Sequence, residues 1–157
     1  MVSPPPPQTP QDSPWAVEVW EDKFGHSPFW ASYDKLDEYD QAVLDTVIEH
    51  LVSREGMNLI SSEWGKALGQ GLYEIRIRRD LTALMNGLNP QGSAPPTSRD
   101  AKRKVLLRIF CTFHGNRVVL LFHVYNKRKD PSDRRQQKEI ARARNYLKAF
   151  KAEKRDP

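Results

Sequence analysis

Apolar residues recur at helical spacing in two stretches of the N-terminal half. Between Asp37 and Arg54 they recur every three or four positions, while acidic residues gather in the first half, where the helix dipole favours anions. This pattern predicts an amphipathic helix that ends near Gly56. A shorter helix is expected to begin at Ser27-Pro28, because serine caps exposed amide groups and proline suits the first helical position.

Period-two alternation and runs of strand-forming residues predict four β-strands, at 15–20, 72–79, 105–113 and 118–125. The turn formers in 114–117 join the last two strands as an antiparallel hairpin. The glycines in 65–71 predict a loop before the second strand. Within 72–79, Tyr73, Ile75 and Ile77 fall on one face, which we expect in the core, and Glu74, Arg76 and Arg78 fall on the other.

The remaining segments complete the predicted architecture. From Ser132 to 151 an apolar stripe and many basic residues predict a basic amphipathic helix. Residues 1–14 are rich in proline and are expected to form a disordered tail, and 87–103 are expected to form a flexible insertion. The sequence therefore predicts one domain over 15–152, of the α+β class, in which two N-terminal helices and the basic C-terminal helix pack on a small, largely antiparallel four-stranded sheet.

The charge is distributed unevenly along the chain. Residues 1–98 contain 7 Lys/Arg against 14 Asp/Glu, whereas 99–157 contain 18 against 6. A basic segment favours polyanions, because each neutralised phosphate releases condensed counterions. The C-terminal half is thus the expected side for binding a nucleic acid, against the alternative of a well-solvated surface.

Several classes of protein are not supported by the sequence. Cys111 is the only cysteine, so no internal disulfide can form, as expected for a reducing compartment. We expect neither a signal peptide nor a membrane anchor, and so a cytoplasmic protein. The chain has no phosphate-binding loop, nucleophile elbow or zinc-protease motif, and its four histidines lack metal-ligand spacing, so no metal or cofactor is expected.

Cationic residues on three strands form the main candidate site. Arg76 lies on the second strand, Arg108 interrupts the apolar third, and Lys127 and Arg128 follow the fourth. If these strands are neighbours, the side chains converge on one face, where guanidinium groups bind a phosphodiester and stabilise its developing charge. The alternative for Arg108 is an ion pair with a buried carboxylate such as Glu74.

Two side chains on the fourth strand are reserve candidates for acid–base work, His123 and Tyr125. The ordinary pKa of histidine suits proton transfer, and the alternative is a buried, hydrogen-bonded histidine. RNA cleavage needs no metal if the 2′-hydroxyl is held in line with the phosphorus and the developing dianion is neutralised.

An ordered set of segments resembles a known family. The segment 65–77 contains Leu-Tyr-Glu-Ile-Arg, and it is followed by Leu-Arg-Ile-Phe at 107–110, the run 118–127, Asp130-Pro131 and Glu-Ile-Ala at 139–141. This set is similar to the phage-derived, HigB-like branch of the RelE/ParE toxins over about residues 15–152. The resemblance implies the toxin of a type II toxin–antitoxin system, a metal-independent endoribonuclease that cleaves mRNA on the ribosome and inhibits translation and growth.

The resemblance also implies roles for particular residues. Family members use basic side chains on the second strand, an arginine on the third and basic side chains after the fourth; these positions are Arg76, Arg108 and Lys127/Arg128, which we expect to be catalytic. The neighbouring cations are expected to bind RNA: Arg78, Lys129, Arg134 and Arg135. No aromatic in the last helix clearly matches a catalytic tyrosine of the family, and Tyr125 and Tyr146 are the substitutes considered.

Partners and alternatives follow from the same resemblance. A cognate antitoxin, acidic and partly disordered, is expected to cover the positive face, and the complex is expected to bind its own operator DNA through the antitoxin. The superfamily also contains ParE-like toxins that target gyrase, and fold alone does not choose between the two activities. A third alternative is a catalytically silent module that binds only an antitoxin or nucleic acid.

Overall fold

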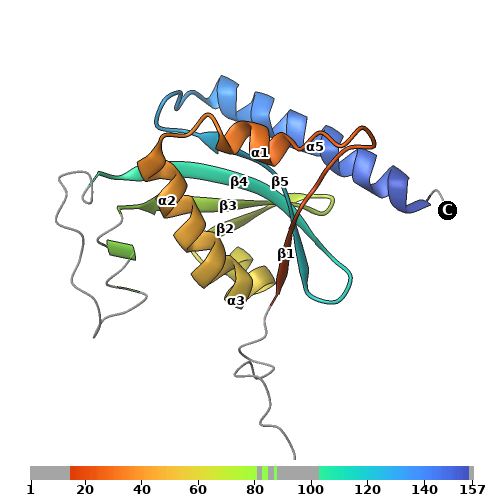
Figure 1. Cartoon of the computed structure of the whole chain (residues 1–157), viewed down its shortest axis with the longest axis horizontal. Helices are drawn as coiled ribbons and strands as arrows, with labels where there is room; N and C mark the ends of the chain where they lie inside the picture. Colours follow the sequence, from red (N-terminus) through yellow and green to blue (C-terminus); the bar gives the residue numbers. More distant parts are fainter. Residues whose placement is uncertain (1–14, 81–82, 85–86, 88–102, 156–157) are drawn as a thin grey trace, which may run out of the picture.

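A computed structural model describes residues 15–80, 83–84, 87 and 103–155 of the chain (Figure 1). Its elements are β1 (Ala16–Val19), α1 (Pro28–Tyr33), α2 (Glu38–Val47), a π-helical turn (Ile48–Val52), α3 (Ser53–Glu55), a 3₁₀ segment (Gly56–Ser61), β2 (Gly65–Gly69), β3 (Leu72–Arg79), β4 (Val105–His114), β5 (Val118–Asn126) and α5 (Asp133–Arg155). The predicted tail 1–14 lies outside the described residues, as does the predicted insertion 87–103 apart from its two ends. The α+β class is confirmed.

A mixed five-stranded sheet organises these elements, in the order β1-β5-β4-β3-β2. Three pairings are antiparallel, and β1 pairs with β5 in parallel. The prediction of four strands is wrong, because the glycine-rich segment before β3 is an edge strand and not a loop. Glycine is tolerated there, since an edge strand has one neighbour, and the positive φ of Gly69 and Gly71 turns the chain into β3.

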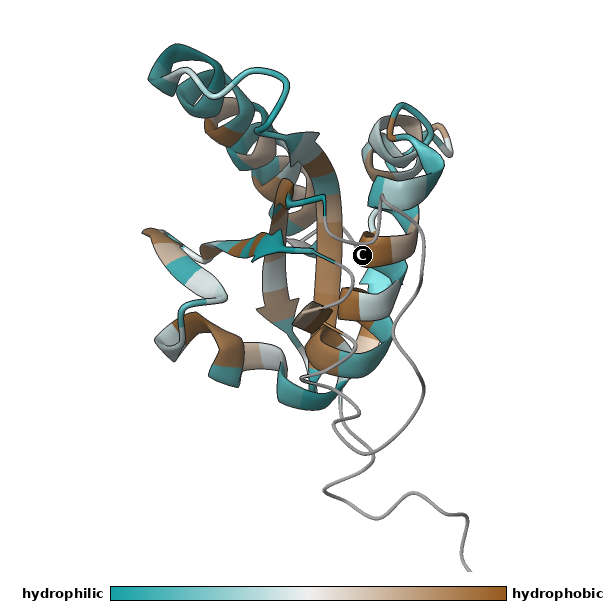
Figure 2. Cartoon of the chain, turned by 90° about the vertical axis from the view of Figure 1, so that its left-hand side faces the viewer, coloured by the Kyte–Doolittle hydropathy of each residue, from teal (hydrophilic) through white to brown (hydrophobic). Residues whose placement is uncertain are grey.

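Each face of the sheet buries a hydrophobic core. Val43, Ile75 and Leu121 belong to the core on the side of α1 and α2. Phe110 and Leu147 belong to the core under α5. Figures 1 and 2 show the sheet between α2 on one side and α5 on the other, with hydrophobic positions gathered on the strands. We call the second side the α5 face, after the helix that covers it. The candidate cations of β3 and β4 lie on this face.

Polar side chains start the predicted helices at the expected places. Ser27 Oγ accepts a hydrogen bond from the backbone N–H of Trp30 at 3.2 Å, which caps α1. Asp37 caps α2 in the same way, and Ser132 Oγ accepts from the N–H of Arg135 at the start of α5. The helix predicted over 37–54 is present as α2, the π-helical turn and α3, and it ends at Gly56.

Gly56 ends this helical segment in a backbone conformation that other residues rarely adopt, with φ of +48°. A Cβ atom there would also lie 2.1 Å from the ring of Trp15, whose backbone N–H donates to Ser53. We therefore expect Gly56→Ala to lower the free energy of unfolding by about 1–2 kcal/mol. Urea denaturation measures this, with Gly87→Ala, where the added Cβ meets no atom within 4 Å, as the control. Equal free energies of unfolding for the two variants would show that neither the φ of Gly56 nor its closeness to Trp15 requires glycine.

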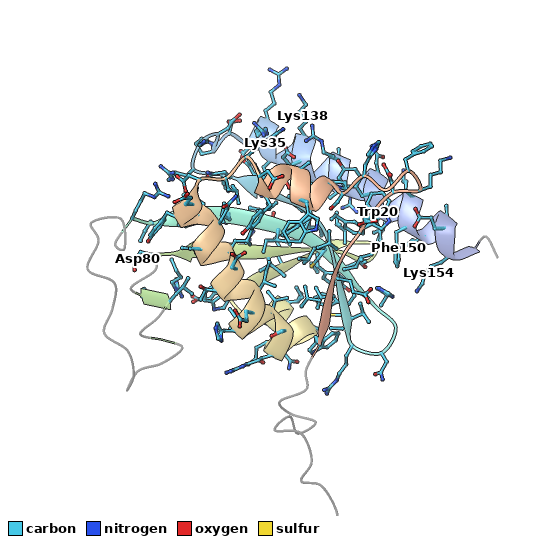
Figure 3. All side chains as sticks on the ribbon, viewed as in Figure 1. Trp20, Lys35, Asp80, Lys138, Phe150 and Lys154 are labelled. Carbon is cyan, nitrogen blue, oxygen red and sulfur yellow. The ribbon has the colours of Figure 1, made fainter. Side chains whose placement is uncertain are left out.

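The basic surface of α5 is partly used to hold the fold together. Arg144 donates hydrogen bonds to the carbonyls of Leu68 and Gly69, and Lys151 Nζ donates to the carbonyl of Gln70. These bonds attach the C-terminal half of α5 to the turn between β2 and β3. The cations that remain for a partner lie elsewhere on the helix, and Figure 3 shows two of them, Lys138 and Lys154, near its two ends. Every helix within the described ranges is too short or too polar to cross a membrane.

Candidate functional site

The three strands that carry the predicted cations are neighbours in the sheet. Arg76 of β3 lies directly opposite Arg108 of β4, and Arg108 lies opposite Tyr125 of β5. Residues that face each other across a sheet project to the same side. The alternation of β3 and β4 therefore places Arg76, Arg108 and Tyr125 in one row on the α5 face.

A buried carboxylate allows two arginines to face each other in this row. Glu74 is fully buried, and its Oε1 accepts a hydrogen bond from Arg76 Nε at 2.9 Å and lies 4.0 Å from Arg108 Nε. Gln136 of α5 donates to the other carboxylate oxygen at 3.4 Å. Like charges opposite each other destabilise a sheet, and Glu74 offsets this repulsion. The ion pair predicted as the alternative for Arg108 is thus present, at the outer limit of ion-pair distance.

Arg108 is buried yet retains unused hydrogen-bonding capacity. Its side chain is 5% exposed, and Nη1 donates to the carbonyl of Leu107 at 3.1 Å. Its Nε is buried and has no hydrogen-bond partner among the described residues. Burial lowers the pKa of Arg108, and Glu74 raises it. A guanidinium held in this way has donors left for an external anion.

Lys127 belongs to the same group of charges. Burial, followed by the charge of Arg108, lowers the pKa of its ammonium group, while Glu74 raises that pKa. We call Arg76, Arg108 and Lys127, with Glu74 beneath them, the sheet site. Arg78 is exposed two positions beyond Arg76, on the same face of β3. The sheet site thus contains three of the four residues expected to be catalytic.

Arg128, the fourth, is not brought into the sheet site. Its Nη2 lies 4.0 Å from Asp40 Oδ2, on α2, which covers the opposite face of the sheet. Asn126 Nδ2 donates to the same carboxylate oxygen at 3.2 Å. The expected convergence of Arg128 with Arg108 is therefore wrong, because a buried aspartate attracts its guanidinium to the α2 side.

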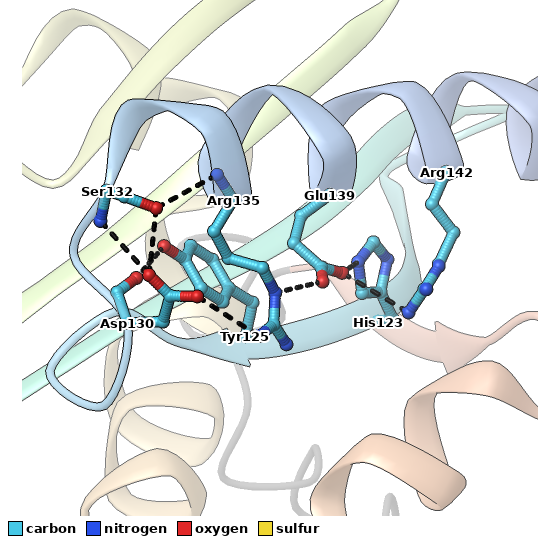
Figure 4. Close-up of polar contacts among 7 residues, drawn as sticks. All are labelled: His123, Tyr125, Asp130, Ser132, Arg135, Glu139 and Arg142. Atoms are coloured by element: carbon cyan, nitrogen blue, oxygen red, sulfur yellow. Dashed lines mark hydrogen bonds and ion pairs between the residues drawn. The ribbon is translucent and has the colours of Figure 1, made fainter.

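A β-bulge in β5 places His123 on the α5 face. Phe110 pairs with His123 whereas the next residue, Cys111, pairs with Leu121, so Phe122 is an extra residue in the strand. The ring of His123 stacks on Phe110 with centroids 4.9 Å apart. Its Nε2 lies 3.0 Å from Glu139 Oε1 of α5 (Figure 4).

Glu139 is the centre of a hydrogen-bonded network with three partners (Figure 4). Besides His123, Arg135 Nε donates to it at 2.7 Å and Arg142 Nη1 at 3.4 Å. The hydrogen bond from His123 is the main cause that lowers the pKa of Glu139 to about 2. Glu139 is therefore an anion at neutral pH.

His123 is the neutral partner of this anion. Burial lowers the pKa of its imidazole. Because the carboxylate of Glu139 can only accept, Nε2–H is the group that donates in this hydrogen bond. Its Nδ1 is buried without a hydrogen-bond partner among the described residues. The sequence-based alternative of a buried, hydrogen-bonded histidine is confirmed, and the acid–base role of His123 stays a prediction.

A cleft of about 290 Å³ opens beside this network, between α5 and the segment that follows α1. Four cationic side chains line it: Lys35, Lys129, Arg135 and Arg142. Tyr125 also lines it, and its hydroxyl donates to the carbonyl of Asp130 at 2.6 Å. Burial raises the pKa of Tyr125. We call this feature the edge cleft, because it follows the part of β5 that β1 does not cover.

The edge cleft contains several residues expected to act on RNA and two that sequence reasoning missed. Lys129 and Arg135 line it, whereas Arg134 is exposed on α5 and does not. The missed residues are Arg142, whose spacing from Arg135 and Glu139 on one helical face was available as a signal, and Lys35, for which the sequence has no signal. Tyr146, a substitute considered for a catalytic tyrosine, packs against Trp20 and His123 in the core under α5.

Comparisons with known proteins add no family to this geometry. No protein-family profile matches the chain, and no curated protein matches it. Within the described ranges, no three His, Cys, Asp or Glu side chains gather closely enough to hold a metal ion. The sheet site, the edge cleft and the resembling sequence segments are therefore the features that bear on function.

Proposed function

We propose that the chain is the toxin of a type II toxin–antitoxin pair of the RelE/ParE kind, an endoribonuclease that cleaves mRNA on the ribosome. The observation that carries the proposal is the pair Arg76 and Arg108, opposite each other on β3 and β4 and sharing one buried carboxylate. Guanidinium groups fixed in this way suit a phosphodiester, which they contact through planar, charge-assisted hydrogen bonds.

The residues of the sheet site have the chemistry that RNA cleavage requires. The 2′-hydroxyl attacks the adjacent phosphorus in line, and the phosphoryl oxygens gain negative charge that Arg76 and Arg108 stabilise. Glu74 accepts a hydrogen bond from Arg76 and lies 4.0 Å from Arg108 before substrate binds, so little reorganisation is needed during the reaction. Lys127, whose pKa is lowered by burial and by Arg108, is our candidate for proton transfer, since it releases a proton more readily than an ordinary lysine.

The sheet site reaches the surface through Arg76, which is 25% exposed, whereas Arg108 is 5% exposed and Glu74 is buried. The hollow lined by Trp64, Arg76 and Arg78 holds only about 10 Å³. A polymer can approach the site from the side of Arg76, and so can a protein that neutralises it. We accordingly propose that a cognate acidic antitoxin covers the sheet site in the cytoplasm, and that the complex binds its operator DNA through the antitoxin.

Induction of the wild type and Arg76→Gln in bacterial cells tests the proposal. We expect growth arrest with the wild type, with new RNA 5′ ends within translated regions. Arg76→Gln is expected to reduce cleavage about tenfold, because Arg76 is partly exposed and its loss is partly compensated by solvent. Arg54→Gln is the matched control, since Arg54 is exposed on α3 and has the same charge.

The other outcomes would redirect the assignment. Growth arrest without transcript cleavage would contradict the nuclease and favour a protein target such as gyrase. Normal growth with soluble protein and intact transcripts would favour a catalytically silent binding module. Equal cleavage by Arg76→Gln and Arg54→Gln would remove the sheet site from the mechanism.

A further inference from the structure

The edge cleft exists because the first strand is shorter than its neighbour. β1 pairs with β5 only as far as Leu121, and beyond that point a helix covers the edge of the sheet. Ser32 of α1 supplies the contact, since its Oγ accepts a hydrogen bond from the backbone N–H of Val124 at 3.1 Å. The following residues of β5 form the floor of the cleft, and α5 forms one wall (Figure 4).

The walls of the edge cleft have an excess of positive charge. Lys35, Lys129, Arg135 and Arg142 are cationic, and Glu139 is the one carboxylate among the lining residues. No ion pair joins Lys35 or Lys129 to any other side chain in the described part of the chain. Both are exposed. Their charge is therefore available to an anion that enters the cleft.

Glu139 orients the two arginines that complete this wall. It accepts hydrogen bonds from Arg135 Nε and Arg142 Nη1, and both side chains remain about half exposed. Each guanidinium contacts the carboxylate through one nitrogen, which leaves its other donors for a ligand. Arg135 is also neutralised in part by Asp130, at 3.6 Å. The cleft is thus a prearranged set of donors with its counter-charge buried beneath.

Tyr125 is shared by the edge cleft and the row of side chains that forms the sheet site. This residue lies opposite Arg108 in the sheet, and it also lines the cleft. The guanidinium of Arg135 lies 5.4 Å from the centre of its ring. The sheet site and the edge cleft are therefore adjacent, separated in the sheet by one buried tyrosine.

We infer that the edge cleft is a second phosphate subsite, which binds a backbone phosphate of single-stranded RNA beside the linkage held at the sheet site. The inference rests on the proposed function and adds to it the path of the substrate. The volume of the edge cleft, about 290 Å³, is near the lower end for small-ligand sites, which suits one nucleotide and not a duplex. Glu139 is a positioning residue for this subsite, since it acts through Arg135 and Arg142.

Binding of an oligonucleotide that cannot be cleaved tests the subsite. The probe is a fluorescent single-stranded nonamer with 2′-deoxyribose throughout, and anisotropy is measured at several salt concentrations. The variant Lys35→Gln with Lys129→Gln removes two exposed cations of the cleft. We expect it to weaken binding about tenfold and to reduce the slope of log affinity against log salt by about 0.7, the value for one lost phosphate contact on a single strand.

A charge-matched control separates the subsite from general electrostatics. Lys148→Gln with Lys154→Gln removes the same charge from exposed positions on α5 that do not line the cleft, and Figure 3 shows Lys154 at the end of α5 remote from Lys35. Arg142→Gln, a second test variant, is expected to weaken binding in the same direction as the lysine variant.

Equal effects of the cleft variant and the control would overturn the inference, and so would a wild type that does not bind the probe. Neither result affects transcript cleavage, which is read separately in cells and decides the proposed function. A protein that cleaves RNA but shows no difference between the two double variants would retain the function and lose the subsite.

Discussion

Replacing Arg108 by lysine is expected to lower the rate of RNA cleavage about a hundredfold while the protein remains folded. Lysine keeps a positive charge near Glu74, so the buried carboxylate still has two cationic neighbours. It lacks the planar fork that contacts two phosphate oxygens together. Single-turnover cleavage of a ribosome-bound transcript measures the rate, and thermal unfolding checks the fold.

Arg78→Lys is the matched control for this substitution. Arg78 lies on the same face of β3 but is exposed, and its Nη2 donates to the carbonyl of Glu63 at 3.4 Å. We expect its cleavage rate to change less than threefold, which is within the range of an exposed contact. A wild-type rate in Arg108→Lys would show that Arg108 contributes charge without bidentate contact. Unfolding of the same variant would show that its role is structural.

The sheet site was largely predictable because it depends on alternation within strands. The period of two in 72–79 places Arg76 on the charged face, and the hairpin at 114–117 places the next two strands together. The position of Arg128 was not predictable in this way, because it follows the end of β5, where alternation no longer fixes direction. The carboxylate that attracts it, Asp40, lies 88 residues earlier in the chain.

The fifth strand and the edge cleft depend on contacts that local pattern does not contain. β2 has three small residues in five, so its composition favours a loop until the pairing with β3 is known. The cleft brings Lys35 beside α5 only because β1 ends early and α1 covers the free edge of β5. The bulge in β5 that turns His123 toward Glu139 is likewise a tertiary feature, since it depends on the pairing register of β4 and β5.

Replacing Glu139 by glutamine is expected to lower the free energy of unfolding by about 2–3 kcal/mol near neutral pH. The pKa of Glu139 falls from 4.5 to about 2 on folding, which corresponds to roughly 3 kcal/mol. Screening reduces this, because Arg135 and Arg142 are 43% and 49% exposed. Glutamine has nearly the same shape and still accepts from His123. Urea denaturation measures the loss, with Glu153→Gln, an exposed position on the same helix, as the control.

The pH dependence distinguishes lost charge from lost packing in this variant. A carboxyl whose pKa is lowered by folding stabilises the protein fully above its unfolded pKa of about 4.5, and this contribution is lost as the pH falls towards 2. The shifted pKa of His123 also makes the stability of the fold decrease as the pH falls, but in a higher pH range. Its pKa is also lowered in the folded state, so the unfolded chain takes up its proton first below about 6.5. We therefore expect the stability of the wild type and of Glu139→Gln to converge between pH 4.5 and 2.5, because only the wild type then loses the charge of Glu139. A difference that stays constant over this range would mean that Glu139 stabilises the fold by shape and not by charge.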